Sequence, residues 1–156
     1  MLKYACEALW NLGLDNDDNR RRVAQAGSVE VVVKAMKQHP FNVRLLEHAS
    51  ALLQNLSTHT DEENRKECEE RRSLIGKAGG VNAVTKAIQR HPSFTELVKV
   101  GCGTLRNLCV GNDDNRRRVA QAGGCRSGSE GHEGSSVQCA PLRTGMCCAT
   151  YSIYAY

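Results

Sequence analysis

The chain has 156 residues, which is enough for about one domain with a core of ordinary size. Aromatic residues make up only 4%, so the core must be built from Leu, Val, Ala and Ile, which suits helix packing better than a sheet sandwich. The net charge of +4 permits an acidic partner without requiring one. Because we find no signal-peptide pattern and no apolar run near the roughly 18 residues of a membrane span, we expect a cytoplasmic or nuclear protein without a membrane partner.

An internal repeat is the strongest feature of the sequence. Residues 16–27 read NDDNRRRVAQAG, and residues 112–123 read the same twelve letters. A pattern Leu-x-Asn-Leu occurs three times, with its Asn at positions 11, 55 and 107. These spacings of 44 and 52 fit a unit of 44 residues with one insertion of 8, which lies between residues 64 and 79. Units of this size are typical of helical HEAT and armadillo arrays.

Each unit is predicted to contain three helices. The first begins at Asp17 or Asp18, which would serve as the N-cap, and stops at Gly27. The second follows at once with one apolar stripe and ends before Pro40. The third covers residues 42–56. The insertion is predicted to lengthen the first helix of its unit by about two turns.

A short helix, a glycine corner and two longer helices resemble the armadillo repeat. The resemblance rests on the corner KAGG at residues 77–80 and on the Leu-x-Asn-Leu close, and it covers residues 1–124. Repeats with a His-Pro element are similar to those in long armadillo arrays of single-celled eukaryotes. The resemblance implies an all-α, armadillo-type α-α superhelix, a right-handed solenoid with two full repeats and partial repeats at both ends.

This reading divides the chain into five parts. They are the third helix of a truncated repeat (1–15), one repeat (16–60), a repeat with the insertion (61–111), the first helix of an incomplete repeat (112–124) and a disordered or aberrant tail (125–156). Arrays normally cover their end faces with capping repeats. The partial repeats therefore predict marginal stability, self-association through uncapped ends, or a place in a longer parent.

In armadillo proteins the third helices line a concave groove, where an Asn ladder binds the backbone of an extended peptide. The resemblance places Asn11, Asn55 and Asn107 at the ladder position. An alternative stays open, because an Asn near a helix end can also cap that helix or bond a neighbouring turn.

Other residues of the same face narrow the class of peptide. Nuclear-import adaptors carry Trp one turn before the Asn, but here those positions hold Glu7, Ala51 and Gly103, which argues against a reader of basic import signals. Further along the face lie Glu47 and Lys99, with His48 beside them, so the charges there are of both signs. We therefore include Glu7 and the members of this mixed set in the candidate groove.

Two arginine triplets, at residues 20–22 and 116–118, raise the alternative of nucleic-acid binding. Each triplet follows two Asp residues on a short helix that is expected to be solvated, so opposite charges offset one another. No aromatic residue is interleaved to stack on bases. Nucleic acid is therefore the weaker hypothesis.

Catalysis and cofactors find no support in the sequence. It has no glycine-rich phosphate loop, no paired carboxylates on one apolar face and no Ser-centred elbow, and His39 and His91 precede Pro in both units, which suggests an architectural role. We predict no catalytic residue, no cofactor and no metal. A zinc set could be drawn from the tail, but its gaps lack paired Cys-x-x-Cys spacing; its members would be Cys125, His132, Cys139 and Cys147.

The predicted function is that of a protein–protein interaction scaffold or adaptor, which binds an extended peptide or a helix on the third-helix face. The sequence does not identify that partner. The alternative is a regulatory or structural arm of a larger multidomain protein such as a kinase.

Overall fold

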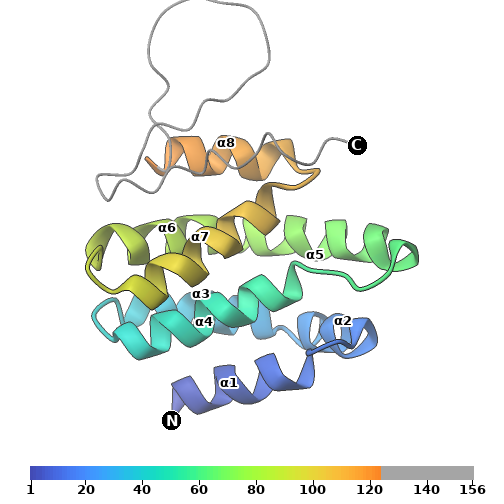
Figure 1. Ribbon diagram of the computed structural model, residues 1–156, viewed down its shortest axis with the longest axis horizontal. Coiled ribbons are helices and arrows are strands. Elements are labelled where there is room, and N and C mark those ends of the chain that lie inside the picture. The colour runs from blue at the N-terminus through green and yellow to red at the C-terminus, as the bar shows by residue number, and fades with distance from the viewer. Residues whose placement is uncertain (124–156) are drawn as a thin grey trace, which may run out of the picture.

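The computed structural model describes residues 1–123, which form an all-α arrangement without strands (Figure 1). The predicted tail and its cysteines lie outside these residues. Within the described range, no helix combines the length and the apolar character needed to cross a bilayer. The elements are α1 (Leu2–Leu12), α2 (Asp17–Gln25), α3 (Ser28–Gln38), α4 (Val43–Leu56), the 3-10 helix η1 (Glu62–Asn64), α5 (Arg65–Lys77), α6 (Gly80–Arg90), α7 (Thr95–Cys109) and α8 (Asp113–Gln121).

The predicted order of a first, second and third helix occurs twice, as α2–α3–α4 and as α5–α6–α7. Gly27 and Gly79 separate the first helix from the second in each case, with φ angles of 78° and 89° that glycine adopts without strain. The second helices end at His39 and His91, each of which precedes a proline. The glycine and proline signals therefore place these helix boundaries correctly.

The predicted N-cap of the first helix is wrong by one or two residues. Asn16 caps α2, because its side-chain oxygen accepts a hydrogen bond from the backbone N–H of Asn19 at 2.9 Å. Asn112 caps α8 in the same way. Asp17 and Asp18 instead occupy the first turn, where a carboxylate is favoured by the positive end of the helix dipole. Asp17 is thus free for a different contact.

The insertion is divided between a helix and a loop. The first helix of the middle unit, α5, has 13 residues, whereas α2 and α8 have 9 each. This is about one extra turn, and not the two that were predicted. The rest lengthens the connection, because α5 begins ten residues after Asn55 while α2 begins six after Asn11. Half of the insertion therefore separates α4 from α5.

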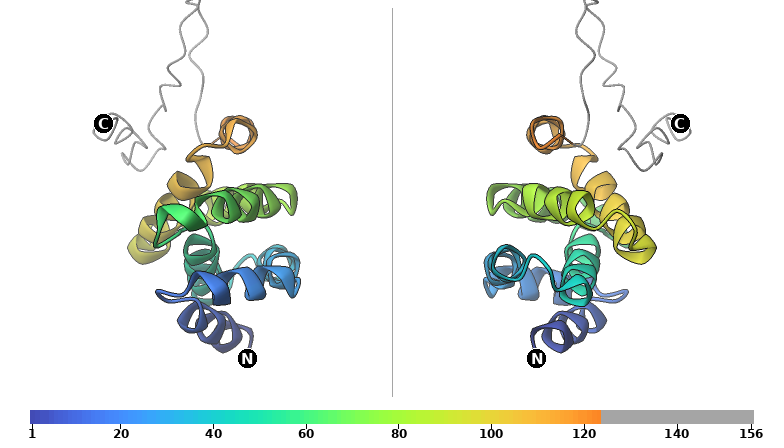
Figure 2. Two further views of the ribbon diagram at one scale, coloured as in Figure 1. Left: turned by 90° about the vertical axis from the view of Figure 1, so that its right-hand side faces the viewer. Right: turned by 90° about the vertical axis from the view of Figure 1, so that its left-hand side faces the viewer.

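The third helices α1, α4 and α7 lie side by side along one side of the molecule, and the remaining helices lie along the other (Figure 2). Helix α4 packs against α1 and α7, and α6 packs against α3 and α7. Apolar side chains fill the space between the two layers. The middle third helix contributes the largest share of fully buried leucines: Leu45, Leu46, Leu52, Leu53 and Leu56.

Replacement of one such leucine tests this core. Leu52→Ala should lower the free energy of unfolding by about 2–5 kcal/mol, because it leaves a cavity where the side chain is 0% exposed. Urea unfolding of the full chain, followed by far-UV circular dichroism, measures the change. The control Val31→Ala removes a side chain that is 63% exposed, so it should shift stability by less than about 0.5 kcal/mol. Equal effects of the two changes would contradict the described core.

Candidate functional site

The residues predicted to bind a peptide all lie on α1, α4 and α7. Asn11, Asn55 and Asn107 stand in the last turn of these helices, at matching places in the repeat. We call the face that these three Asn residues mark the third-helix surface. The three helices are neighbours in one layer, with α4 between α1 and α7 (Figure 2).

The three Asn side chains differ in their accessibility. Asn11 is exposed, Asn107 is half-buried and Asn55 is only 7% exposed. The side-chain oxygen of Asn55 lies 2.4 Å from the place that a Cβ would take on Gly13, so the missing side chain of that glycine makes room for it. The side chains of Asn11 and Asn107 are therefore accessible, whereas Asn55 offers little surface.

Local capping would tie these amides to nearby backbone. Within residues 1–123, the side chains of Asn11 and Asn107 make no hydrogen bond to another residue, and the buried oxygen of Asn55 has no partner. The described part of the chain thus holds no contact that supports the capping alternative.

The charged residues of this face have the mixed signs that the sequence implies. Glu47 is half-buried and pairs with Arg44 at 3.3 Å, while Lys99, at the matching position of α7, is exposed. Glu7 and His48 are both half-buried. The face therefore carries charges of both signs.

A repeated hydrogen bond holds the end of each third helix in place. The last carbonyls of a helix have no partner within the helix, and here the next first helix supplies one. We call this bond the carbonyl latch, and its acceptor is always the closing Leu of the Leu-x-Asn-Leu pattern. The three latches are Asn19 Nδ2 to Leu12 O (2.8 Å), Arg71 Nε to Leu56 O (2.9 Å) and Asn115 Nδ2 to Leu108 O (2.9 Å).

A second donor often supports the latch. Arg72 Nε donates to the carbonyl of Ser57 at 3.0 Å, and Arg116 Nε donates to the carbonyl of Cys109 at 3.1 Å. Arg72 also reaches the carbonyl of Val110 at 3.2 Å, which ties α5 to the turn before α8. These bonds fix the helix ends on which the Asn residues stand.

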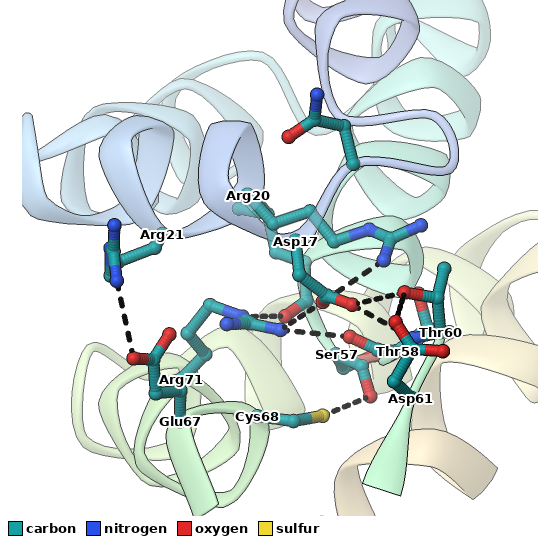
Figure 3. A network of polar contacts seen from close by, with 12 residues as sticks. Asp17, Arg20, Arg21, Ser57, Thr58, Thr60, Asp61, Glu67, Cys68 and Arg71 are labelled. Carbon is teal, nitrogen blue, oxygen red and sulfur yellow. Dashed lines mark hydrogen bonds and ion pairs between the residues drawn. The ribbon is translucent and has the colours of Figure 1, made fainter. Parts of the chain in front are cut away.

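A buried ionic network joins the first two units, as Figure 3 shows. The Oδ1 atom of Asp17 accepts from Arg20 at 3.0 Å and from Arg71 at 3.1 Å. Its Oδ2 atom accepts from the backbone N–H of Thr60 at 2.8 Å and from the Thr60 hydroxyl at 2.6 Å. The three charged side chains are only 4–6% exposed. One carboxylate therefore connects α2, α5 and the loop between α4 and α5.

The pKa of Asp17 reflects these contacts. Burial alone would raise this pKa, but the hydrogen bonds from Thr60 and Arg20 outweigh it and lower the pKa from 3.8 to about 2. A carboxyl group with a lower pKa in the folded state stabilises the fold above its unfolded pKa, and this contribution is lost as the pH falls through the folded value. Acid should therefore weaken this joint between pH 4 and 2.

Five of the six arginines in the two triplets pair with carboxylates, but the triplets are not fully solvated as predicted. Arg20 is 4% exposed and pairs with buried Asp17. Arg21 contacts Asp18 and also Glu67, the latter at 3.3 Å. In the second copy, Arg116 pairs with Asp113 at 2.7 Å. The carboxylates thus neutralise guanidinium groups that a nucleic acid would require.

Sequence reasoning missed the role of Arg71 and its partner Asp17. Both lie in stretches dense in charge, which favoured a solvated face. One signal was available: eight residues before the glycines at 27, 79 and 123 stand Asn19, Arg71 and Asn115, the three latch donors. Alignment of the units on these glycines, instead of on the insertion, would have identified the position.

Cys6, Cys68 and Cys102 are free thiols with structural surroundings. Burial raises the pKa of Cys6, Cys68 and Cys102, which keeps these thiols protonated. The Cys68 thiol donates to the carbonyl of Ser57 at 3.2 Å. Residues 1–123 contain no group of three or more His, Cys, Asp or Glu side chains that could hold a metal ion. The zinc set considered above lies outside this range.

Comparison with known proteins gives one informative similarity. The chain is 32% identical over 104 residues to Protein aardvark of Dictyostelium discoideum. The matched segment is 67% of this chain but 13% of that protein, so the chain spans a small part of its relative's length. No protein-family model matches the chain, and no solved structure matches it significantly.

Removal of the buried charge should weaken the joint between the units. Asp17→Asn leaves two buried guanidinium groups without a full counter-charge, which we expect to cost about 3–5 kcal/mol of unfolding free energy at pH 7. The difference from the natural chain should shrink by about 2 kcal/mol as the pH falls from 5 to 2, since protonation removes the same charge. Urea titrations at a series of pH values measure both quantities.

The identical peptide in the second copy supplies the matched control. Asp113 has the same neighbours in sequence, but its side chain is 80% exposed and pairs only with Arg116 among the described residues. Asp113→Asn should therefore change stability by at most about 1 kcal/mol. Equal losses for the two variants would show that burial of Asp17 does not matter.

The latch of α7 can be tested through its neighbour Gly76. A Cβ at this position would lie 1.8 Å from the side-chain oxygen of Asn115, so Gly76→Ala must displace that side chain. Loss of its bonds to the carbonyls of Leu108 and Arg72 should cost about 1–3 kcal/mol. In an Asn115→Ala background the same change should be neutral or stabilising, because alanine favours helix over glycine. Equal costs in both backgrounds would contradict the latch.

Proposed function

We propose that the chain is a segment of an armadillo-type, right-handed solenoid that binds an extended peptide along the third-helix surface. It would act as a non-catalytic interaction scaffold in the cytoplasm or nucleus. The observation that supports this best is the free amide groups of Asn11 and Asn107, which stand at matching positions of helices in one layer. An amide offers a donor and an acceptor together, which suits the backbone of an extended strand.

The rigidity of the helix ends favours this role. The carbonyl latches fix the last turn of α1, α4 and α7, where the three Asn residues stand. A ligand then meets a preformed row of groups and does not have to order them, which lowers the entropic cost of binding. Asn55 contributes to packing beneath the row, since its side-chain oxygen is buried against Gly13.

The charge pattern defines the kind of peptide. Glu47 and Lys99 occupy matching positions with opposite sign, and Glu7 adds a second carboxylate near α1. A peptide with both acidic and basic residues complements this face better than a uniformly basic one. The positions of Glu7, Ala51 and Gly103 lack the Trp residues that would hold lysine stems.

The chain would have the same role as an arm of a larger protein. In Protein aardvark the similar segment is 13% of the whole chain, so there it is one part of a much longer protein. A scaffold segment of this kind would position neighbouring domains by the same surface. The peptide could then come from the same parent chain or from another protein.

Selection from a displayed random-peptide library on the immobilised full chain tests the proposed surface. Peptides recovered in this way should bind with affinities that fall about 2–10-fold in Asn107→Ala and in Asn11→Ala, the loss expected for one backbone hydrogen bond. Isothermal titration calorimetry measures these affinities. Asn55→Ala is less informative, because its amide is part of the packing around Gly13.

Asn82→Ala provides the control. Asn82 is exposed on α6, in the other layer, so its loss should leave peptide affinity unchanged. Selected peptides that bind equally well to the natural chain and to the Asn11→Ala, Asn107→Ala double variant would overturn the proposed surface.

A further inference from the structure

A cleft lies between α3 and α6, in the layer opposite the third-helix surface. It has a volume of about 230 Å³, with a floor of buried apolar side chains and a rim of cations. Met36, Leu46, Ala83 and Ala87 are each at most 8% exposed and form the floor together with half-buried Pro40. The rim consists of exposed Lys37, Lys86 and Arg90.

The charge of this cleft is of one sign. None of its lining residues is acidic. Helix α6 carries no carboxylate, and the only one on α3 is Glu30, which stands in the first turn. The two helices together carry four cations: Lys34, Lys37, Lys86 and Arg90. This face is therefore positive, in contrast to the mixed third-helix surface.

An exposed aromatic ledge extends the cleft at one end. Phe41 is 76% exposed and Phe94 is 50% exposed, and the ring of His91 lies between them with edge contacts to both. The His91 Nε2 atom lies 2.8 Å from the carbonyl of Pro40, so the ledge is fixed to the cleft wall. The guanidinium of Arg90 lies over the Phe41 ring, 5.3 Å from its centre. Apolar and cationic groups thus alternate along this face.

From this arrangement we infer that the α3–α6 cleft is a second binding site, which takes an acidic peptide segment with an apolar side chain. The apolar side chain enters between Met36 and Ala83, where burial removes its surface from water. Carboxylates on both sides of it pair with Lys37, Lys86 and Arg90. The inference does not depend on the third-helix surface, because the cations of the cleft all lie on α3 and α6, in the other layer.

Two features favour a peptide over other polyanions. The apolar floor is recessed between two helices, so it admits a side chain. The exposed rings of Phe41 and Phe94 lie in turns at one end of the cleft, whereas a membrane contact needs apolar groups along a broad helix face. The exposed Phe41 ring is already covered on one face by Arg90, which leaves it poorly placed for stacking on bases. The other cleft, along α5, is not uniformly positive, since Glu69 and Glu70 line it together with lysines.

The test uses a fluorescein-labelled peptide of sequence GEEDLFDEEG and the full chain, with anisotropy as the readout. We expect saturable binding at low salt that weakens as salt is added, because exposed ion pairs are screened. Lys86→Glu combined with Arg90→Glu should weaken binding at least about tenfold. Replacement of the Leu-Phe pair of the peptide by Ser-Ser should weaken it by about tenfold as well, since the apolar contact is lost.

Two controls separate this site from overall charge and from the third-helix surface. Lys66→Glu combined with Lys77→Glu makes the same charge change in the α5 cleft, and it should alter the affinity by less than about twofold. Asn107→Ala should leave it unchanged, so failure here and failure of the third-helix surface are distinguishable. Far-UV circular dichroism verifies that each variant is folded.

Three results would overturn the inference. One is the absence of saturable binding up to about 1 mM peptide. Another is equal binding of the Leu-Phe and Ser-Ser peptides, which would indicate plain attraction of a polyanion. The third is tighter binding to phosphatidylserine vesicles or to single-stranded DNA than to the peptide, with the same dependence on Lys86 and Arg90, which would assign the face to a membrane or a nucleic acid.

Discussion

The carbonyl latch is the contact on which the arrangement of the helices depends. The end of a helix leaves carbonyl groups unpaired, which is costly where they are buried, as at Leu56 and Leu108. At every boundary between described units, the next first helix sends one side chain back to the carbonyl of the closing Leu. Asn performs this task twice and Arg71 once, so the position requires a donor that reaches the carbonyl, and not one residue type. The row of Asn residues on the third-helix surface is held by these bonds.

The identical peptides at residues 16–27 and 112–123 show that the next unit alters the charge environment of a helix and leaves its backbone unchanged. Both fold into a helix of the same length with the same Asn cap. In the first copy the middle unit covers Asp17, and the approach of Arg71 and Thr60 turns a surface pair into a buried network. In the second copy Asp113 remains exposed, with Arg116 as its ion-pair partner. Local structure is set by the peptide, whereas the charge environment is set by what packs on it.

This difference explains how much could be predicted from the sequence. The helices and their ends followed from Gly27, Gly79 and the prolines, because those residues act on the backbone locally. The N-cap was misplaced, since Asn16 and Asp17 are both good caps and only packing decides between them. The sites were harder to predict. Asn11 and Asn55 look equivalent in sequence, yet the absence of a side chain on Gly13 leaves room for the amide of Asn55 to be buried. The proposed armadillo surface and the α3–α6 cleft both depend on such contacts across units.

Because of the latch, the unit that repeats in the sequence differs from the unit defined by contacts. By sequence, a unit runs from one first helix to the close of its third helix. By contacts, that close is complete only when the first helix of the following unit is present, as Arg71 is for Leu56. A segment that contains its own latch is therefore shifted by one helix relative to the repeat. Boundaries for recombinant fragments, and crossover points for swapping units between related arrays, belong after a first helix and its glycine, near residues 27, 79 and 123.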